Sequence, residues 1–385
     1  MKKILLFTLA LLSALVFASC AQTKTPASNE HDTTPKQSIE LVCEDGKIIV
    51  KGVFDNTASD AQKYTVNCAV VRNNAEKPLN ISKSFDLVQG ENSFEIKLNI
   101  GAKEQNVSVS VTADDGTELC SPCEKSFKSL RLLSIGNSFS VDAQEHLYGI
   151  AKDMGFDNVV LGNLYVGGCS LQGHYNYFIN ERNPYTYYKN TTGEWTEKAE
   201  TSMLEGIVDE DWDYITLQQA SGLSGDSDSF EPYLEKLINV IKLNRTNPNA
   251  EILWHMTWAY ASDSTHQDFP KYNNDQNLMY DSIVGAVKKN IDGNADILYV
   301  LPAGTAIQNA RNTSLGDTLC RDGFHLELGY GRYLAGLTWI HKITGQPIDD
   351  VIYIPDGAFN EDTLEILKKC AKDAVNNPFE VTVDG

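Results

Sequence analysis

The sequence predicts a mixed α/β fold, in which a domain built on a parallel sheet follows a small all-β domain. Between residues 38 and 127, short runs of alternating or β-branched residues recur without any helical stretch. From residue 128 onward, apolar strand-like runs alternate with stretches of helical spacing. The chain has 385 residues, of which 42% are hydrophobic, so it is long enough for two domains and too apolar to be disordered.

Residues 1–19 have the features of a secretory signal peptide. Two lysines precede an apolar run over 4–17, and two small residues lead to Cys20. This arrangement resembles a bacterial lipoprotein signal, whose cysteine is lipidated after cleavage. We therefore expect an exported protein anchored through Cys20 to the cell envelope, at the outer membrane, with a flexible tether over 20–37. The alternative is an ordinary secretory peptide with an incidental cysteine.

Residues 38–127 predict a small β-sandwich of immunoglobulin-like type, because six short strands are separated by turn residues. No cluster of catalytic residue types occurs in this domain. We interpret it as a spacer or packing domain, with a carbohydrate-binding module as the alternative. The expected strands are 38–44, 47–54, 64–71, 81–88, 92–100 and 106–113.

Residues 128–385 predict a second domain with a parallel sheet covered by helices on both faces. In such domains, ligands bind at the carboxyl ends of the strands. The expected strands are 130–135, 158–168, 212–219, 250–260 and 296–302, and the expected helices are 143–156, 230–245, 278–291, 328–344 and 361–375.

The first of these strands runs directly into Gly136-Asn137-Ser138, with a helix following. Backbone N–H groups and the helix dipole at such a turn can stabilise a developing oxyanion, which favours Ser138 as a nucleophile. The alternative is that Ser138 merely caps the helix. A nucleophilic serine also needs a base to take its proton.

Among the seven histidines, His325 has a carboxylate, Asp322, three residues earlier in a loop. That spacing lets Asp322 accept a hydrogen bond from one ring nitrogen while the other nitrogen faces the serine. His174, His255 and His266 remain possible bases. The alternative interpretation of the Asp-Gly step is a plain turn.

Together these segments resemble the SGNH (GDSL-like) hydrolase superfamily, and in particular a less characterised branch in exported bacterial lipoproteins that is similar to carbohydrate acetylesterases. The resemblance covers about residues 128–345 and is carried by SIGNSFS, GGCSLQGH, WDYITLQQAS, MTWAY and DGFHL. It implies a flavodoxin-like, three-layer α/β/α domain that hydrolyses acyl esters. Ser138 would attack the ester carbonyl, His325 would move the proton, and Asp322 would orient His325.

The resemblance also implies an oxyanion hole with three donors. Two are the backbone N–H groups of Ser138 and Gly168. The third is usually an asparagine amide, but this chain has Leu217-Gln218-Gln219 at that point. Gln219 is the expected donor and Gln218 the alternative, since strand alternation lets only one of them face the site.

An aromatic-rich insertion over 175–195, with an Asn-Thr-Thr-Gly hairpin turn, favours a carbohydrate substrate. Trp258 and Tyr260, after a later strand, are expected to extend this aromatic wall.

The predicted function is a serine esterase that removes acyl groups, chiefly O-acetyl, from carbohydrates. One alternative is a non-catalytic, surface glycan-binding lipoprotein with a hydrolase-like fold. Another is a glycoside hydrolase with two catalytic carboxylates.

The charge balance excludes some partners. With 52 acidic and 32 basic residues, the formal net charge of -20 repels nucleic acid. The Cys-Ser-Pro-Cys run over 120–123 has no second cysteine pair to complete a zinc site. We therefore expect no metal and no cofactor.

Overall fold

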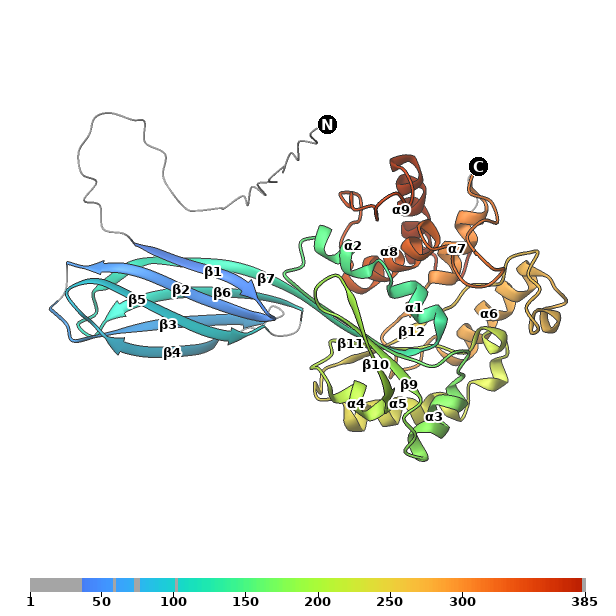
Figure 1. The fold of residues 1–385 in the computed structure, drawn as a ribbon, viewed down its shortest axis with the longest axis horizontal. Coiled ribbons are helices and arrows are strands. Elements are labelled where there is room, and N and C mark those ends of the chain that lie inside the picture. Colours follow the sequence, from blue (N-terminus) through green and yellow to red (C-terminus); the bar gives the residue numbers. More distant parts are fainter. Residues whose placement is uncertain (1–36, 58–59, 73–76, 101–102, 383–385) are drawn as a thin grey trace, which may run out of the picture. The chain divides into compact units, whose positions relative to one another are not determined.

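The computed structural model describes residues 37–57, 60–72, 77–100 and 103–382 (Figure 1). The expected signal peptide, the expected lipidation site Cys20 and all but the last residue of the tether lie outside the described residues. Within the described ranges, no helix combines the length and the apolar character needed to cross a membrane.

The first part of the chain forms two antiparallel sheets that share one apolar core. One sheet has the order β1-β2-β5, and in the other β3 pairs with β4 and β6, while β6 pairs with β7 (Figure 1). All six predicted strands are confirmed. They are β1 (Ser38–Glu44), β2 (Lys47–Asn56), β3 (Lys63–Arg72), β4 (Leu79–Asp86), β5 (Gly90–Asn99) and β6 (Glu104–Ala113).

A single strand, β7 (Glu118–Gly136), belongs to both parts of the fold. Its first half pairs with β6 as far as Lys128, and its second half pairs with β8 from Ser129 onward. The expected domain boundary after residue 127 therefore falls inside a continuous strand. The sequence pattern indicated only its second half, where every residue from 129 to 136 is buried.

The larger part of the chain is built on parallel strands in the order β8-β7-β11-β12-β13. A hairpin of β9 and β10 (Figure 1) extends the sheet beyond β8, as the Asn-Thr-Thr-Gly turn predicts. The strands are β8 (Asn158–Tyr165), β9 (Tyr185–Asn190), β10 (Trp195–Thr201), β11 (Tyr214–Leu217), β12 (Glu251–His255) and β13 (Val300–Leu301).

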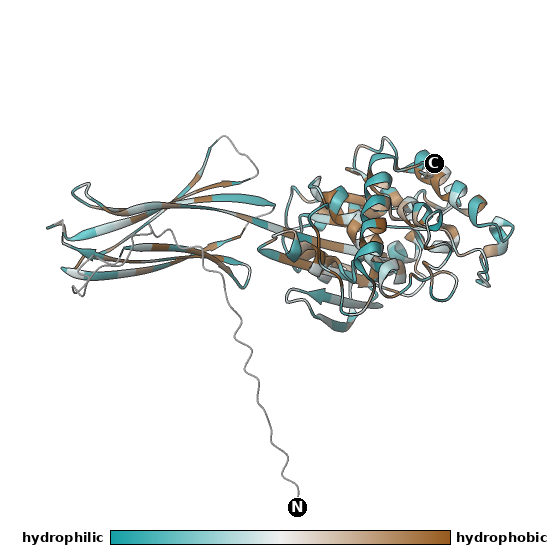
Figure 2. Ribbon diagram, turned by 90° about the horizontal axis from the view of Figure 1, so that it is seen from above, coloured by the Kyte–Doolittle hydropathy of each residue, from teal (hydrophilic) through white to brown (hydrophobic). Residues whose placement is uncertain are grey.

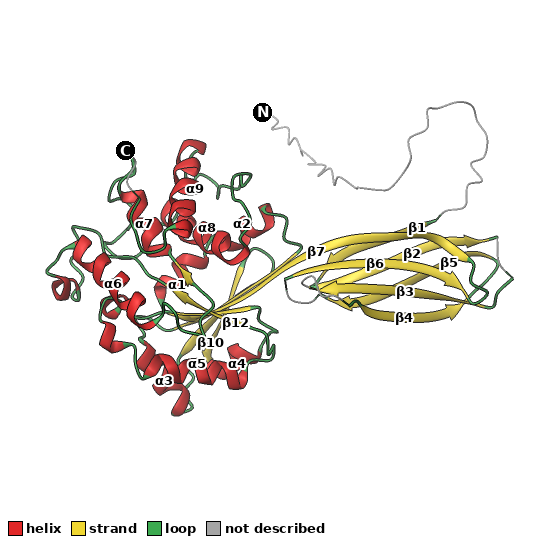
Figure 3. Cartoon of the chain, turned by 180° about the vertical axis from the view of Figure 1, so that it is seen from behind, coloured by secondary structure: helices red, strands yellow, loops and turns green. Residues whose placement is uncertain are grey.

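Helices pack on the sheet in two groups, one of α1, α2, α7, α8 and α9 and one of α3, α4 and α5, which lie on either side of it in Figures 1 and 3. Apolar residues gather on the central strands and on the helices packed against them (Figure 2). The helices are α1 (Ser138–Gln144), α2 (Leu147–Asp153), α3 (Leu171–Ile179), α4 (Met203–Val208), α5 (Tyr233–Asn244), α6 (Gln276–Asn290), α7 (Ala303–Arg311), α8 (Tyr330–Thr344) and α9 (Glu361–Asn376), with short 3₁₀ turns at Ser221–Leu223, Ser227–Ser229 and Phe269–Tyr272.

The helices differ from the prediction in two ways. The expected helix over 143–156 is two short helices, because the chain breaks at His146, whose Nε2 lies 2.8 Å from the carbonyl oxygen of Leu328. Helices α3, α4 and α7 lie outside the expected helices, and all nine residues of α7 are buried.

A buried carboxylate, Asp213, lies just before β11 and contacts β7. Its Oδ2 accepts a hydrogen bond from the backbone N–H of Arg131 (3.0 Å), and the guanidinium Nε of Arg131 lies 4.0 Å away. Burial raises the pKa of Asp213 to about 6, and the Arg131 charge offsets this only in part. The pKa of Asp213 is therefore higher in the folded protein than in the unfolded chain. It follows that the free energy of unfolding is larger when this carboxyl is protonated and falls as it ionises.

We expect Asp213→Asn to remove a pH dependence of stability. Relative to this variant, the wild type should lose about 2–3 kcal/mol of unfolding free energy as pH rises from about 4 through 6. Urea unfolding at several pH values measures the difference. Parallel pH profiles for the two proteins would contradict the expectation.

Candidate active site

The turn between β7 and α1 exposes Ser138 while its neighbours are fixed. Asn137 is the N-cap of α1, since its Oδ1 accepts from the backbone N–H of Phe139 (3.0 Å). The same oxygen accepts from Gln218 Nε2 (2.8 Å), and Asn137 Nδ2 donates to the carbonyl oxygen of Cys169 (3.2 Å). Because Asn137 caps the helix, the hydroxyl of Ser138 is left for other chemistry. The alternative that Ser138 is a capping residue is therefore wrong.

Gly136, which precedes this turn, cannot be replaced without displacing its neighbours. A Cβ atom on Gly136 would lie 2.7 Å from Ser140 Oγ and 2.8 Å from Gln218 Oε1. Both contacts are shorter than a Cβ tolerates. The close packing under the turn therefore requires glycine at this position.

Ser138, His325 and Asp322 form a continuous chain of hydrogen bonds. His325 Nε2 lies 2.8 Å from Ser138 Oγ, and His325 Nδ1 lies 2.7 Å from Asp322 Oδ2. A carboxylate oxygen only accepts, so Nδ1 carries the ring proton and Nε2 accepts from the serine hydroxyl. This is the arrangement in which a histidine removes a proton from serine.

The carboxylate of Asp322 is fixed in the ionised form. Partial burial acts to raise its pKa, but hydrogen bonds from the His325 ring and from the backbone N–H groups of His325 and Phe324 outweigh this effect and lower the pKa. The side chain of His325 is 21% exposed, so a substrate can reach it.

The other candidate histidines are engaged elsewhere. Complete burial lowers the pKa of both His174 and His255 to about 3, so each ring is neutral. Their Nδ1 atoms lie 2.9 Å from Tyr185 Oη and 3.1 Å from Gln218 Oε1. His266 Nδ1 accepts from a backbone N–H at 3.1 Å.

A second carboxylate, Asp142, joins helix α1 to the loop that carries the proposed base. Asp142 lies one turn after Ser138, and its side chain is 1% exposed. Its Oδ2 accepts from the backbone N–H of Leu326 (2.8 Å), and its Oδ1 accepts from Arg332 Nε (2.8 Å) and Arg321 Nη1 (3.3 Å). Arg321 also donates to the carbonyl oxygen of Leu326. The segment that contains Asp322 and His325 is thus closed on itself and tied to the helix that begins at Ser138.

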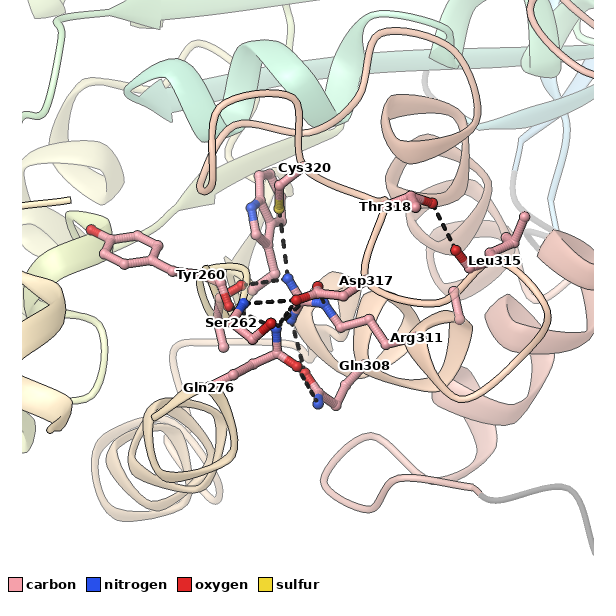
Figure 4. Close-up of polar contacts among 12 residues, drawn as sticks. Tyr260, Ser262, Gln276, Gln308, Arg311, Leu315, Asp317, Thr318 and Cys320 are labelled. Carbon is pink, nitrogen blue, oxygen red and sulfur yellow. Dashed lines mark hydrogen bonds and ion pairs between the residues drawn. The ribbon is translucent and has the colours of Figure 1, made fainter. Parts of the chain in front are cut away.

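The preceding part of the same loop is held by Arg311 at the end of α7 (Figure 4). Arg311 Nε lies 2.9 Å from Asp317 Oδ1, and Arg311 Nη2 donates to the carbonyl oxygen of Ala259 (3.0 Å). Asp317 Oδ2 accepts from the backbone N–H of Ser262 (2.7 Å) and from Gln276 Nε2 (3.0 Å). Partial burial acts to raise the pKa of Asp317, but the Ser262 hydrogen bond and the Arg311 charge outweigh it and hold the pKa below its usual range.

Two backbone groups are available for an oxyanion. Gly168 has φ +62° in the exposed turn after β8, a conformation that favours glycine. Among the residues that the structure describes, neither Gly168 N–H nor Ser138 N–H has a hydrogen-bond acceptor. Both donors are therefore free to bind a substrate oxygen.

The structure does not place Gln219 as a third donor. Its Oε1 accepts from the backbone N–H groups of Leu171 (3.1 Å) and Ala220 (2.8 Å), and its Nε2 donates to the carbonyl oxygen (3.1 Å) and Oγ (3.0 Å) of Ser229. The amide therefore braces two loops. Gln218 is equally engaged, since its Nε2 donates to Asn137 and its Oε1 lies next to the His255 ring.

Trp258 and Tyr260 also differ from the prediction, because neither side chain reaches solvent (both 0% exposed). Trp258 stacks on Phe139 with ring centroids 4.3 Å apart, and its Nε1 donates to the carbonyl oxygen of Phe324 (2.8 Å). Tyr260 Oη lies 2.8 Å from Ser221 Oγ. Both aromatics support the active-site loops from beneath and do not line a substrate wall.

The sequence alone did not indicate which residues position Ser138, His325 and Asp322; in the structure these are Asn137, Asp142, Arg321 and Arg332. One signal for Asp142 was present, since a residue four positions after Ser138 lies on the same face of the helix.

In the described part of the chain, no group of three His, Cys, Asp or Glu side chains has the arrangement of a metal site.

Residues 131–374 match the family model described as "Domain of unknown function (DUF4886)", and the chain belongs to this family. A crystal structure of a DUF4886 family protein from Bacteroides uniformis ATCC 8492 is 38% identical, with a TM-score of 0.63. The alignment covers 66% of this chain and 98% of that protein. Comparison with proteins of curated function gave no match.

Weaker likenesses include LAE5, an α/β hydrolase enzyme from the metagenome of Lake Arreo, Spain, at 8% identity and a TM-score of 0.34, covering 57% of this chain and 97% of that one. BT4096, a gut microbial diltiazem-metabolizing enzyme, is 13% identical with a TM-score of 0.34, covering 57% of this chain and 48% of that one. Both are too distant to carry an argument about function.

We expect Asp142→Asn to slow the chemical step more than it weakens substrate binding. The amide loses the charged contacts to Arg321 and Arg332, so the segment with His325 shifts relative to Ser138. With p-nitrophenyl acetate as a probe of the serine, kcat should fall by about 10- to 100-fold while KM changes little.

Glu145→Gln is the matched control, because Glu145, directly after the same helix, also pairs with Arg332 (3.2 Å), whereas the bond to the backbone of Leu326 is made by Asp142. It should retain near wild-type kcat. Equal kcat values in wild type and Asp142→Asn would show that the contacts of Asp142 do not position His325.

Proposed function

We propose that this protein is a serine esterase that hydrolyses acyl esters, chiefly O-acetyl esters, on carbohydrates. The observation that carries the proposal is the chain of hydrogen bonds from Ser138 Oγ through His325 to Asp322, at 2.8 and 2.7 Å. Such a chain makes a serine nucleophilic, and here it lies where a substrate can reach it, since the His325 side chain is 21% exposed.

In the proposed reaction, Ser138 Oγ attacks the ester carbonyl while His325 Nε2 takes its proton. The backbone N–H groups of Ser138 and Gly168 bind the resulting oxyanion. His325 then protonates the departing alcohol, which leaves an acyl group on Ser138. A water molecule, deprotonated by His325, releases the acid, and Asp322 stabilises the imidazolium in both halves.

The strand order supports assignment to the SGNH hydrolases. Taken in chain order, the parallel strands run 2-1-3-4-5, which is the order of flavodoxin-like, three-layer α/β/α domains. The proposed nucleophile follows the first of these strands, as ligand-binding residues do in such sheets. For the two antiparallel sheets before it, we propose an immunoglobulin-like spacer.

The proposed setting is the cell envelope. The signal-like segment and Cys20 favour an exported lipoprotein held at the outer membrane by its lipid, with the enzyme part on the tether. The acidic net charge of -20 favours neutral substrates such as acetylated glycans over nucleic acids.

Release of acetate from acetylated plant and host glycans tests the proposal. We expect wild type to release acetate, and Ser138→Ala and His325→Ala each to lower kcat/KM by at least about 10³-fold, since the members of such a triad act as a unit. His341→Ala, which alters a histidine on α8 bonded to Gln346, is the control and should retain activity.

Activity that survives in folded Ser138→Ala would rule out the serine mechanism. Release of reducing ends by that variant would favour a glycoside hydrolase. Binding of glycans by the wild type without any acetate release would favour the non-catalytic, glycan-binding alternative.

A further inference from the structure

Tyr165 lies next to Gly136, two residues before the proposed nucleophile, although it follows Ser138 by 27 positions in the sequence. It is the last residue of β8 and pairs with Gly136 in the parallel register of β7. The next backbone N–H, that of Val166, donates to the carbonyl oxygen of Gly136 (3.2 Å). The side chain of Tyr165 therefore starts next to the turn that carries Ser138.

The ring of Tyr165 extends over the turn that supplies the second oxyanion donor. Its Oη lies 3.2 Å from the position that a Cβ atom on Gly167 would take. On its other side, the ring of Tyr188 from β9 lies 5.8 Å away at an interplanar angle of 52°. Both tyrosines are partly exposed, and Gly167 and Gly168 are exposed.

The hydroxyl groups of Tyr165 and Tyr188 differ in their hydrogen bonding from those of the neighbouring tyrosines. Tyr185 and Tyr187, from the same hairpin, are buried, and their hydroxyls contact His174 (2.9 Å) and Asp209 (2.8 Å). Among the described residues, the hydroxyls of Tyr165 and Tyr188 have no hydrogen-bond partner. Two aromatic faces with unused hydroxyls therefore meet solvent at the edge of the site.

We propose that Tyr165 and Tyr188 form a platform that stacks against the sugar ring of the substrate and selects cyclic over acyclic acetyl esters. This inference rests on the proposed esterase function and names the group that the leaving alcohol must carry. A sugar ring offers an apolar face for an aromatic ring and hydroxyls for the two free tyrosine hydroxyls. An acyclic polyol ester offers no comparable face.

The test compares two neutral substrates, peracetylated methyl xyloside and glycerol triacetate, by acetate release. In wild type, kcat/KM should favour the sugar. In Tyr165→Leu, the ratio of the two kcat/KM values should fall about tenfold, chiefly through a higher KM for the sugar. A tenfold change corresponds to the loss of about one aromatic contact. Tyr165→Phe keeps the ring and should recover most of the selectivity.

Tyr299→Leu is the matched control, because Tyr299 is another partly exposed tyrosine, directly before β13 and therefore at the amino ends of the parallel strands. It should leave the ratio unchanged. If wild type hydrolyses neither substrate, the esterase proposal fails. If wild type hydrolyses both and Tyr165→Leu keeps the wild-type ratio, or Tyr299→Leu lowers it instead, the platform is wrong and the esterase proposal stands.

Discussion

The buried carboxylate of Asp142 joins two segments that lie 184 residues apart in the chain and must meet within hydrogen-bond distance. It holds the backbone of Leu326 at 2.8 Å, immediately after His325, while it sits one helical turn beyond Ser138. Two guanidinium groups, from Arg321 and Arg332, compensate its charge, which makes the buried position tolerable. The separation of the proposed nucleophile and base is therefore set in part by this one side chain, which belongs to one segment and bonds to the other.

The parallel sheet provides the frame for this interaction. Because β7, β8, β11 and β12 are parallel, their carboxyl ends bring Gly136, Tyr165, Gln218 and His255 to one edge. Polar side chains there bond to one another instead of to solvent: His255 contacts Gln218, and Gln218 holds Asn137. The turn that presents Ser138 is thus fixed from beneath, and the serine hydroxyl is left to bond with His325.

The sequence alone predicts those features of the site whose chemistry requires residues close together in the chain. Asp322 and His325 are three residues apart because one loop must orient the ring, and the Gly-Asn-Ser turn has to follow a strand. The side chain of Gln219 was beyond prediction, because its choice between an oxyanion and the backbone of Leu171 depends on how distant loops pack. An aromatic residue after a strand looks the same in sequence whether it is buried, as Trp258 is, or partly exposed, as Tyr165 is.

The most direct test of the account is whether Ser138 is an activated nucleophile in the folded protein. Intact mass and peptide mass spectrometry after treatment with a fluorophosphonate would measure this. The account predicts one phosphonyl group per chain, on Ser138, at a rate that falls sharply in His325→Ala. A folded wild-type protein that remains unlabelled at Ser138, or one whose labelling does not depend on His325, would contradict it.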